Sequence, residues 1–314
     1  MITISYINFW TDPENDSYFT KFINYNIGET KLINSNDNPD ILIASVFGDI
    51  NNVTKCNAKL KLFYFGENLN RFPPYNNDNL LHNTFDLIVG FRYTNLDKKI
   101  LRFPLWLMYY DYYSVFNSEN NIIKHIENKY KQNIKRDKPI FATLISRHDR
   151  EGQRTKIWNA LLKYESTRSK IMSPGDFRNN TDKIGQTTED KINYISKSIY
   201  NICPENSSYE GYFTEKIFQA FESGTIPIYW AIDFPEQDII NKNKYCFCNI
   251  NNQKEMQDSI DNAIMHPDLY LEGNLFTDNA ENIIQKYYDD LRDNIKIKLG
   301  YIKNRVFMYH KYIK

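Results

Sequence analysis

The stretch between residues 200 and 230 combines polar, charged and turn-forming residues in an order that suits anion binding. Ser198–Cys203 is predicted to form a strand, and Thr214–Ser223 a helix that begins after a polar loop. Thr214 is a favourable N-cap residue, and Lys216 follows in the first turn. A lysine opposes the partial positive charge of a helix N-terminus unless an anion binds beside it. The segment therefore indicates a phosphate site; the alternative is an ordinary helix with a solvent-exposed lysine.

The sequence offers no familiar metal-binding pattern. It has no Asp-x-Asp motif, and its five histidines are scattered without His-x-x-x-His spacing. None of the four cysteines, Cys56, Cys203, Cys246 and Cys248, belongs to a Cys-x-x-Cys pair. We therefore expect free buried thiols and no zinc or other metal site.

The composition describes a neutral chain with ordinary hydrophobic content. Its 314 residues carry 39 basic and 39 acidic side chains, and 41% are hydrophobic. These values predict two domains, or one large domain, with buried cores, and they exclude a wholly disordered chain. Zero net charge lacks the positive field typical of nucleic-acid-binding proteins, so such a role would rest only on the basic C-terminal end. No apolar run approaches the roughly 20 residues that span a membrane, and the N-terminus lacks a signal-peptide pattern, so we expect a cytoplasmic protein.

Predicted strands alternate with predicted helices in two blocks, which indicates right-handed βαβ units and parallel sheets. The expected domains are 1–137, 138–275 and a helical C-terminal part, 276–314. The first block has strands at Ile2–Phe9, Ile41–Phe47, Lys61–Phe65 and Phe85–Phe91. The second has strands at Ile140–Ser146, Ser198–Cys203, Thr225–Trp230 and Tyr245–Ile250, with helices at Glu151–Tyr164, Thr188–Lys197, Thr214–Ser223 and Gln253–Ala263.

The C-terminal end is basic, apolar and free of acidic residues from Lys296 onward. Such a pattern is typical of a helix that lies on an anionic membrane surface, which would make the protein peripheral to the membrane. The alternative is a helix that packs back across the domains. The basic residues are Lys296, Lys298, Lys303, Arg305, Lys311 and Lys314.

The segment that follows Cys203 also resembles a known family signature. The elements Glu205-Asn206, Gly211-Tyr212-Phe213-Thr214-Glu215-Lys216 and Gly224-Thr225-Ile226-Pro227-Ile228-Tyr229-Trp230 resemble those of bacterial α1,3/4-fucosyltransferases of glycosyltransferase family 10. The resemblance extends to Phe9-Trp10, Asn38-Pro39-Asp40, Gly66-Glu67-Asn68, Leu101-Arg102-Phe103-Pro104-Leu105 and Arg178-Asn179-Asn180, and covers most of residues 1–250. The chain departs from the pattern at Ala231, where glycine is usual, and in the long link from Phe141 to Arg154.

This resemblance implies an α/β protein of the GT-B fold: two Rossmann-like domains facing across a cleft, the first on the acceptor side and the second binding the donor. The implied reaction moves L-fucose from GDP-β-L-fucose, with inversion and in a single displacement, to a glycan hydroxyl. Acceptors in the family are GlcNAc of N-acetyllactosamine-type glycans and lipopolysaccharide O-chains. The resemblance also assigns Asn206, Tyr212 and Glu215 to the donor site, where the Glu215 carboxylate would accept sugar hydroxyls.

The chemistry of inversion requires a base for the acceptor hydroxyl and positive charge for the departing diphosphate. Because the chain lacks Asp-x-Asp, cationic side chains must supply that charge, and Arg154 and Lys216 are the candidates. We therefore expect no cofactor and no metal requirement. Glu67, in a turn at the carboxyl end of a predicted strand, is the candidate base, since ligands of open α/β sheets bind at such ends. The alternative is that Glu67 only caps a turn or pairs with Arg71.

Other functions remain open at this point. The protein could be a transferase of the same fold that uses another GDP-deoxysugar, or an inactive glycan-binding relative. Charged residues at all the candidate positions, Glu67, Arg154, Glu215 and Lys216, argue against the inactive relative.

Overall fold

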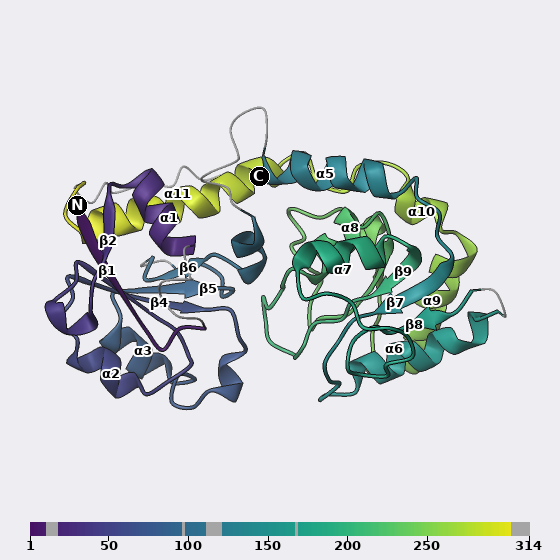
Figure 1. Ribbon diagram of the computed structural model, residues 1–314, viewed down its shortest axis with the longest axis horizontal. Coiled ribbons are helices and arrows are strands. Elements are labelled where there is room, and N and C mark those ends of the chain that lie inside the picture. The colour runs from purple at the N-terminus through teal and green to yellow at the C-terminus, as the bar shows by residue number, and fades with distance from the viewer. Residues whose placement is uncertain (11–17, 96–97, 111–120, 167–168, 303–314) are drawn as a thin grey trace, which may run out of the picture. The chain divides into compact units, whose positions relative to one another are not determined.

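A computed structural model describes residues 1–10, 18–95, 98–110, 121–166 and 169–302. The chain forms two compact units, residues 1–103 with 286–314 and residues 104–285 (Figure 1). The expected boundary at residue 137 differs from this division. The reason is helix α5 (Ile122–Asn133), which follows the polar 117–121 stretch and packs on α8 (Lys216–Glu222) of the second unit. Buried Asn133, for instance, donates to the backbone of Glu222 at 2.6 Å.

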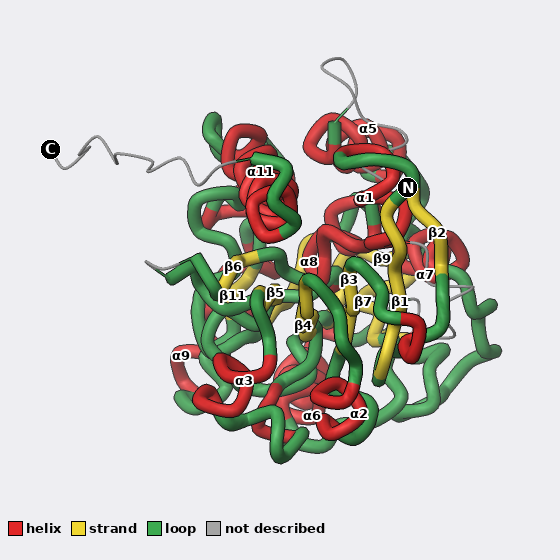
Figure 2. The backbone as a smooth tube through the Cα atoms, turned by 90° about the vertical axis from the view of Figure 1, so that its left-hand side faces the viewer, coloured by secondary structure: helices red, strands yellow, loops and turns green. Residues whose placement is uncertain are grey.

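The first unit contains a six-stranded, fully parallel sheet in the order β2-β1-β3-β4-β5-β6. Its strands are short and apolar, and all four residues of β3 and β5 are buried, as expected when helices cover both faces. Helices α1 and α11 lie on one face, and α2 and α3 on the other (Figures 1 and 2). The elements are β1 (Ile2–Ile7), β2 (Thr30–Leu32), β3 (Ile41–Ala44), β4 (Leu60–Phe65), β5 (Leu87–Gly90), β6 (Ile100–Arg102), α1 (Tyr18–Asn26), α2 (Ile50–Lys55), α3 (Asp78–Thr84) and α11 (Ala280–Lys298).

The second unit contains a five-stranded parallel sheet in the order β11-β10-β9-β7-β8. One face of the sheet shares a core with α6 and α9, through residues such as Leu161 and Ile260. Helices α7 and α8 contact strands β9 and β10. The elements are β7 (Ile140–Leu144), β8 (Ile171–Met172), β9 (Ser198–Ile202), β10 (Ile226–Tyr229), β11 (Cys246–Phe247), α6 (Gln153–Leu161), α7 (Thr188–Ile195), α9 (Gln253–Met265) and α10 (Asp268–Leu271).

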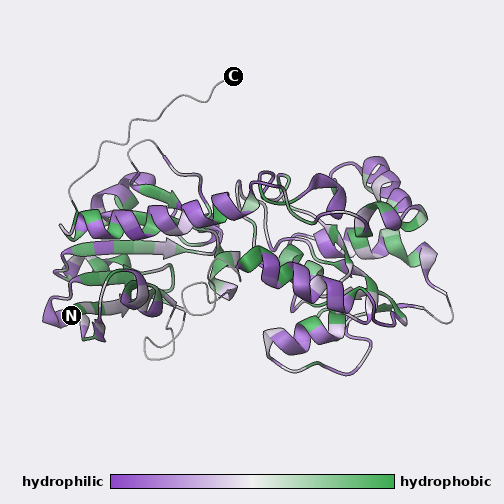
Figure 3. Cartoon of the chain, turned by 90° about the horizontal axis from the view of Figure 1, so that it is seen from above, coloured by the Kyte–Doolittle hydropathy of each residue, from purple (hydrophilic) through white to green (hydrophobic). Residues whose placement is uncertain are grey.

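The C-terminal helix α11 is amphipathic, and the helices that face the viewer in Figure 3 carry both hydrophilic and hydrophobic bands. Within the first unit, Tyr288, Leu291 and Ile295 of α11 are buried, and the Tyr288 ring contacts Phe22 and Phe103. This part of the helix therefore packs on the protein. Residues 303–314, which hold most of the predicted basic tail, lie outside the described residues.

Two parallel sheets with intervening helices confirm the predicted α/β class. Strands β2, β6 and β8 were not predicted, because each has only two or three residues and lies at a sheet edge. The four cysteines are free and buried, as expected. No helix among the described residues is both long and apolar enough to cross a membrane.

Candidate functional site

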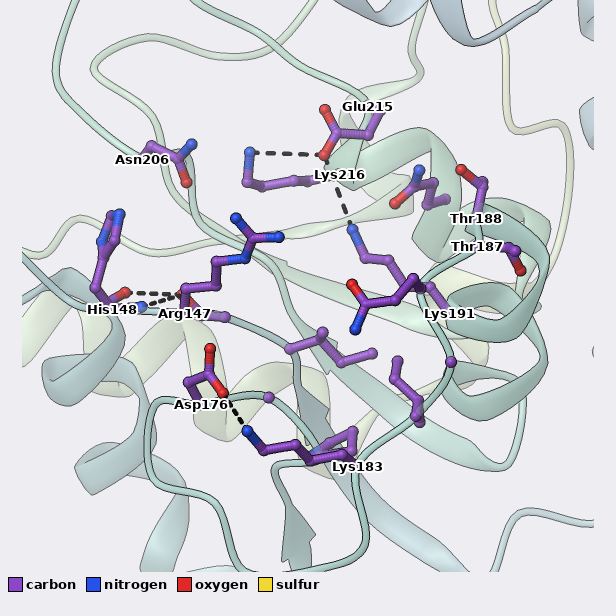
Figure 4. Close-up of a pocket in the computed structure, with 18 of the residues that line it drawn as sticks. Arg147, His148, Asp176, Lys183, Thr187, Thr188, Lys191, Asn206, Glu215 and Lys216 are labelled. Carbon is purple, nitrogen blue, oxygen red and sulfur yellow. Dashed lines mark hydrogen bonds and ion pairs between the residues drawn. The ribbon is translucent and has the colours of Figure 1, made fainter.

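A cavity of about 610 Å³ opens at the carboxyl edge of the second sheet (Figure 4). Ser146 follows β7, Pro174 follows β8 and Asn206 follows β9, and all three line the cavity. The chain runs from β7 to β8 on one side and then returns to β9 on the other, so the strand order reverses at β7. Ligands of open parallel sheets bind outside the carboxyl ends of the strands at such a reversal. The topology therefore favours this cavity as the candidate ligand site.

Positive charge predominates around the cavity. Its lining includes the acidic residues Asp176 and Glu215, whereas the cationic side chains are Arg147, Arg154, Lys183, Lys191 and Lys216. Figure 4 shows the side chains of Arg147 from the loop after β7, Lys191 from α7 and Lys216 from the start of α8 around the cavity. Such a lining favours an anionic ligand, because cationic side chains form strong charge-assisted hydrogen bonds with phosphate oxygens.

A fully buried carboxylate, Glu205, organises the start of α8. Its oxygens accept hydrogen bonds from the Thr214 backbone N–H at 2.8 Å, the Thr214 hydroxyl at 2.7 Å, the Tyr229 hydroxyl at 2.8 Å and Lys216 Nζ at 3.1 Å. The prediction that Thr214 caps the helix is wrong. Helix α8 begins at Lys216, its N-cap is Glu215 without a side-chain cap bond, and Thr214 is instead held by Glu205.

Lys216 is neither solvent-exposed nor in need of a ligand for charge balance. Its side chain is 15% exposed, and its ammonium lies 3.1 Å from Glu205 and 3.9 Å from Glu215. Burial alone would lower the pKa of Lys216, but the two carboxylates outweigh it and raise the pKa above its ordinary value. The predicted conflict with the helix end is thus resolved by protein carboxylates, and a charged lysine remains at the cavity wall.

Glu215 lies between two ammonium groups. Its carboxylate is 3.8 Å from Lys191 Nζ of α7 and 3.9 Å from Lys216 Nζ. Burial would raise the pKa of Glu215, but Lys216 and Lys191 lower it, so this carboxylate stays ionised. The pKa of Lys191 is lowered, mainly by burial and despite Glu215. The cavity wall therefore contains one lysine held firmly in its charged form and another that loses its proton more easily.

Arg154 and Asn206 form a direct pair. Arg154 Nη2 donates to Asn206 Oδ1 at 2.7 Å, and Nη1 donates to the carbonyl oxygen of His148 at 3.0 Å. The arginine is in the first turn of α6, where Asp149 accepts its backbone N–H at 3.1 Å. Burial lowers the pKa of Arg154, although arginine stays protonated at any ordinary pH. Both predicted donor-site residues thus share one wall of the cavity.

The structure separates the remaining predicted residues from this group. Tyr212 is buried and is not among the residues that line the cavity. It lies close enough to Arg154 to influence the pKa of the arginine. Glu67 belongs to the first unit, two residues after β4 ends at Phe65, so the predicted position at a strand's carboxyl end is confirmed. Its carboxylate lies 3.9 Å from Arg71 Nη1, the pairing that the alternative describes.

The sequence reasoning missed several cavity residues. Arg147 and His148 follow β7, and Asp176 and Lys183 face each other in the loop after β8, with Lys183 Nζ 2.6 Å from the Asp176 carboxylate. Figure 4 shows the Arg147 side chain extending into the cavity. The position of Arg147 directly after a predicted strand is the signal that could have revealed it. Lys183 and Lys191 carry no such signal in the sequence.

Among the described residues, no group of three or more His, Cys, Asp or Glu side chains is arranged to hold a metal ion. The charged residues of the cavity are mostly cationic, so they suit the oxygens of an anionic ligand and not a cation.

Comparisons with known proteins identify the family of the chain. Residues 4–109 match the profile of the α-(1,3)-fucosyltransferase FucT N-terminal domain, and residues 134–271 match the C-terminal profile of glycosyltransferase family 10 (fucosyltransferase). The chain is therefore a fucosyltransferase-like member of glycosyltransferase family 10, and its paired parallel sheets are of the GT-B type.

The chain is similar to the α-(1,3)-fucosyltransferase FucT of Helicobacter pylori, with 25% identity over 289 residues. The match covers 83% of this chain but 56% of that protein, so the chain spans just over half the length of this curated relative. It also resembles the crystal structure of an α1,3-fucosyltransferase with GDP-fucose, with 22% identity, a TM-score of 0.66 and coverage of 99% of this chain and 92% of that one. A further α1,3-fucosyltransferase structure gives 22% identity, a TM-score of 0.68 and coverage of 94% and 90%.

Proposed function

We propose that the second unit binds GDP-β-L-fucose in the cavity and that the protein transfers L-fucose to a hydroxyl of a glycan acceptor, with inversion at the sugar C1. The observation that carries the donor site is the convergence of Lys216, Arg154 and Lys191 on one cavity at the carboxyl edge of the sheet. Family membership supports the choice of donor, as does the solved relative that contains GDP-fucose.

The cations of the cavity would neutralise the leaving group. In a single displacement, the acceptor oxygen bonds to C1 while the bond from C1 to the diphosphate oxygen breaks, and GDP leaves with the electron pair. Negative charge on the diphosphate grows in the transition state, so Arg154 and Lys216 would stabilise that state more than the ground state. Side-chain cations in these positions make a metal ion unnecessary in this proposal, so turnover should continue in EDTA.

The remaining donor contacts follow the family assignments. Asn206, already held by Arg154, would bind the donor with its free amide face, and the ionised Glu215 would accept hydroxyls of the donor's sugar or ribose. Tyr212 would act through Arg154, because it influences the pKa of the arginine and does not line the cavity.

Glu67 is proposed as the base that removes the acceptor proton. Its support is its place in a turn at the carboxyl end of β4, where its side chain is 26% exposed and its carboxylate lies 3.9 Å from Arg71 Nη1. The carboxylate would take the hydroxyl proton as the acceptor oxygen attacks C1. The first unit would therefore bind the acceptor.

A radiolabelled transfer assay tests the proposed function. The protein is incubated with GDP-fucose and a panel of acceptors that includes N-acetyllactosamine and O-chain oligosaccharides, with and without EDTA. Transfer to at least one acceptor, unchanged by EDTA, is the expected result. Transfer from another GDP-deoxysugar, but not from GDP-fucose, would favour the second candidate, a transferase with the same cavity and a different donor.

The membrane role of the basic end is a separate proposal, supported by Lys296 and Lys298 in the last turn of α11 and by the acid-free sequence beyond it. Sedimentation with anionic vesicles tests it, and a variant truncated after Gly300 should sediment less than the full chain. Equal sedimentation of the two proteins would count against a membrane-binding tail.

A further inference from the structure

The Glu205 carboxylate accepts four hydrogen bonds, although Glu205 does not line the cavity. Its backbone N–H donates to the Trp230 carbonyl at 2.8 Å, at the end of β10, and its own carbonyl accepts from Gln153 of α6 at 2.9 Å. Both Glu205 and Gln153 are fully buried. The backbone of Glu205 is therefore tied to two elements, which leaves its carboxylate in a defined position.

The carboxylate accepts four hydrogen bonds, of which the one from Lys216 involves a second charge. Lys216 Nζ also donates to the Thr214 hydroxyl at 2.7 Å, and that hydroxyl donates to Glu205 at 2.7 Å. The ammonium is thus held between two oxygens that are themselves held in place. A buried ammonium without such partners would tend to lose its proton.

We propose that Glu205 is a positioning residue of the donor site: its buried carboxylate keeps Lys216 protonated and directs it to the diphosphate of the nucleotide sugar. This inference rests on the proposed donor site. Glu205 touches no ligand in this scheme and acts only through Lys216. Its removal should therefore change nucleotide binding in a manner that depends on the protonation of Lys216.

Calorimetric GDP titrations between pH 6.5 and 9 test the inference on Glu205→Gln. Glutamine keeps the side-chain volume and an oxygen for Thr214 and Tyr229, but it removes the negative charge. In the variant, burial and the positive charges of Arg154 and Lys191 lower the pKa of Lys216, and only Glu215 raises it. The pKa of Lys216 therefore falls. The ratio of the variant's Kd to the wild-type Kd should be within about threefold at pH 6.5 and should rise at least tenfold by pH 9.

Matched variants separate this effect from general damage. Glu236 is another buried carboxylate of the second unit, and it accepts from Trp106 Nε1 at 2.9 Å without lining the cavity. Glu236→Gln should keep the ratio near one at every pH. For Lys216→Ala, the ratio of the variant's Kd to the wild-type Kd should be raised equally at every pH. Adding Glu205→Gln to Lys216→Ala should not raise this ratio further.

A ratio for Glu205→Gln that stays constant with pH, or an effect that adds fully to Lys216→Ala, would overturn the inference. Wild-type protein that does not bind GDP would instead overturn the proposed function. If Glu205→Gln does not fold, Glu205→Asp replaces it. The aspartate keeps the negative charge but holds it farther from Lys216, so GDP binding should weaken by a factor that does not depend on pH. This factor should disappear when Lys216→Ala is also present, and its persistence would contradict the inference.

Discussion

The carboxyl edges of the two sheets differ in chemistry. The edge of the second sheet holds a cavity with five cationic residues and an ordered network of buried carboxylates and hydroxyls. The edge of the first is aromatic. There the Trp10 ring lies 5.4 Å from Phe47, and Phe47 lies 5.5 Å from Phe72, next to the turn that carries Glu67. The Phe47 side chain is 43% exposed.

This contrast suggests that the two units bind different kinds of ligand. Charge gathered around a cavity suits a diphosphate, whose recognition needs many hydrogen-bond donors. Aromatic rings that are partly exposed, as Phe47 is, suit a neutral ligand with apolar surface, such as a sugar ring. The comparison therefore predicts that variants in the two units will change different measured quantities.

The largest effect is expected for Glu67→Gln. Loss of a general base typically slows turnover by about 10²–10⁴, while GDP affinity should remain at the wild-type value because Glu67 does not contact the nucleotide in this scheme. Steady-state kinetics and GDP calorimetry on the same preparation measure both. Full turnover, or a severe loss of GDP binding, would contradict the assignment of the base to the first unit.

Lys216→Ala should have the opposite profile, with GDP affinity lowered about 10–100-fold together with turnover. The estimate corresponds to the loss of one charge-assisted hydrogen bond of about 1.5–3 kcal/mol. Lys242→Ala serves as a control, because this lysine belongs to the same unit and does not line the cavity. Unchanged GDP binding in Lys216→Ala would remove the main support for the donor site.

A buried charge away from the cavity should lower the free energy of unfolding and should not contribute to GDP binding. Glu222 of α8 lies 3.6 Å from His125 of α5 and is bonded to Tyr110, with Lys129 and Glu189 nearby. Burial raises the pKa of Glu222 to about 7. The pKa of Glu222 is higher in the folded state than in the unfolded state. Its contribution to the free energy of unfolding is therefore fully present below about pH 4.5 and is lost as the pH rises through 7.

Glu222→Gln removes this loss, so the variant should resemble wild type at pH 5 and exceed it in free energy of unfolding at pH 8 by up to about 3 kcal/mol. Urea denaturation at the two pH values measures the difference. His125 is retained in both proteins, so its own titration largely cancels in the comparison. A pH-independent difference would show that Glu222 does not titrate as described.

The smallest effect is expected for Arg147→Ala, which removes an exposed cation from the cavity wall. GDP affinity should fall about tenfold, or about 1.4 kcal/mol, if the guanidinium reaches the diphosphate. Arg150, three residues further along the same loop, does not line the cavity, so Arg150→Ala is the matched control. Equal effects of the two substitutions would indicate general electrostatics and no specific contact.

Much of the fold could be predicted because its strands are buried on both faces and its helices are amphipathic. The continuous apolar runs at Ile41 and Leu60 and the spacing of Ile157 and Leu161 are local properties that the sequence displays directly. The two-residue strand β8 and the exact start of α8 could not be predicted in this way, because their bounds depend on partners distant in the sequence.

For the site, the sequence by itself determined the order of elements and the signature from Glu205 to Trp230, because these depend on residue type and spacing alone. Only the tertiary structure brought Arg154, Lys191 and Lys216 to one cavity from three different helices. It also decided that Thr214 bonds to Glu205 and does not cap α8. The physical reason is that a buried carboxylate must find donors, and its donors are set by which strands and helices pack around it.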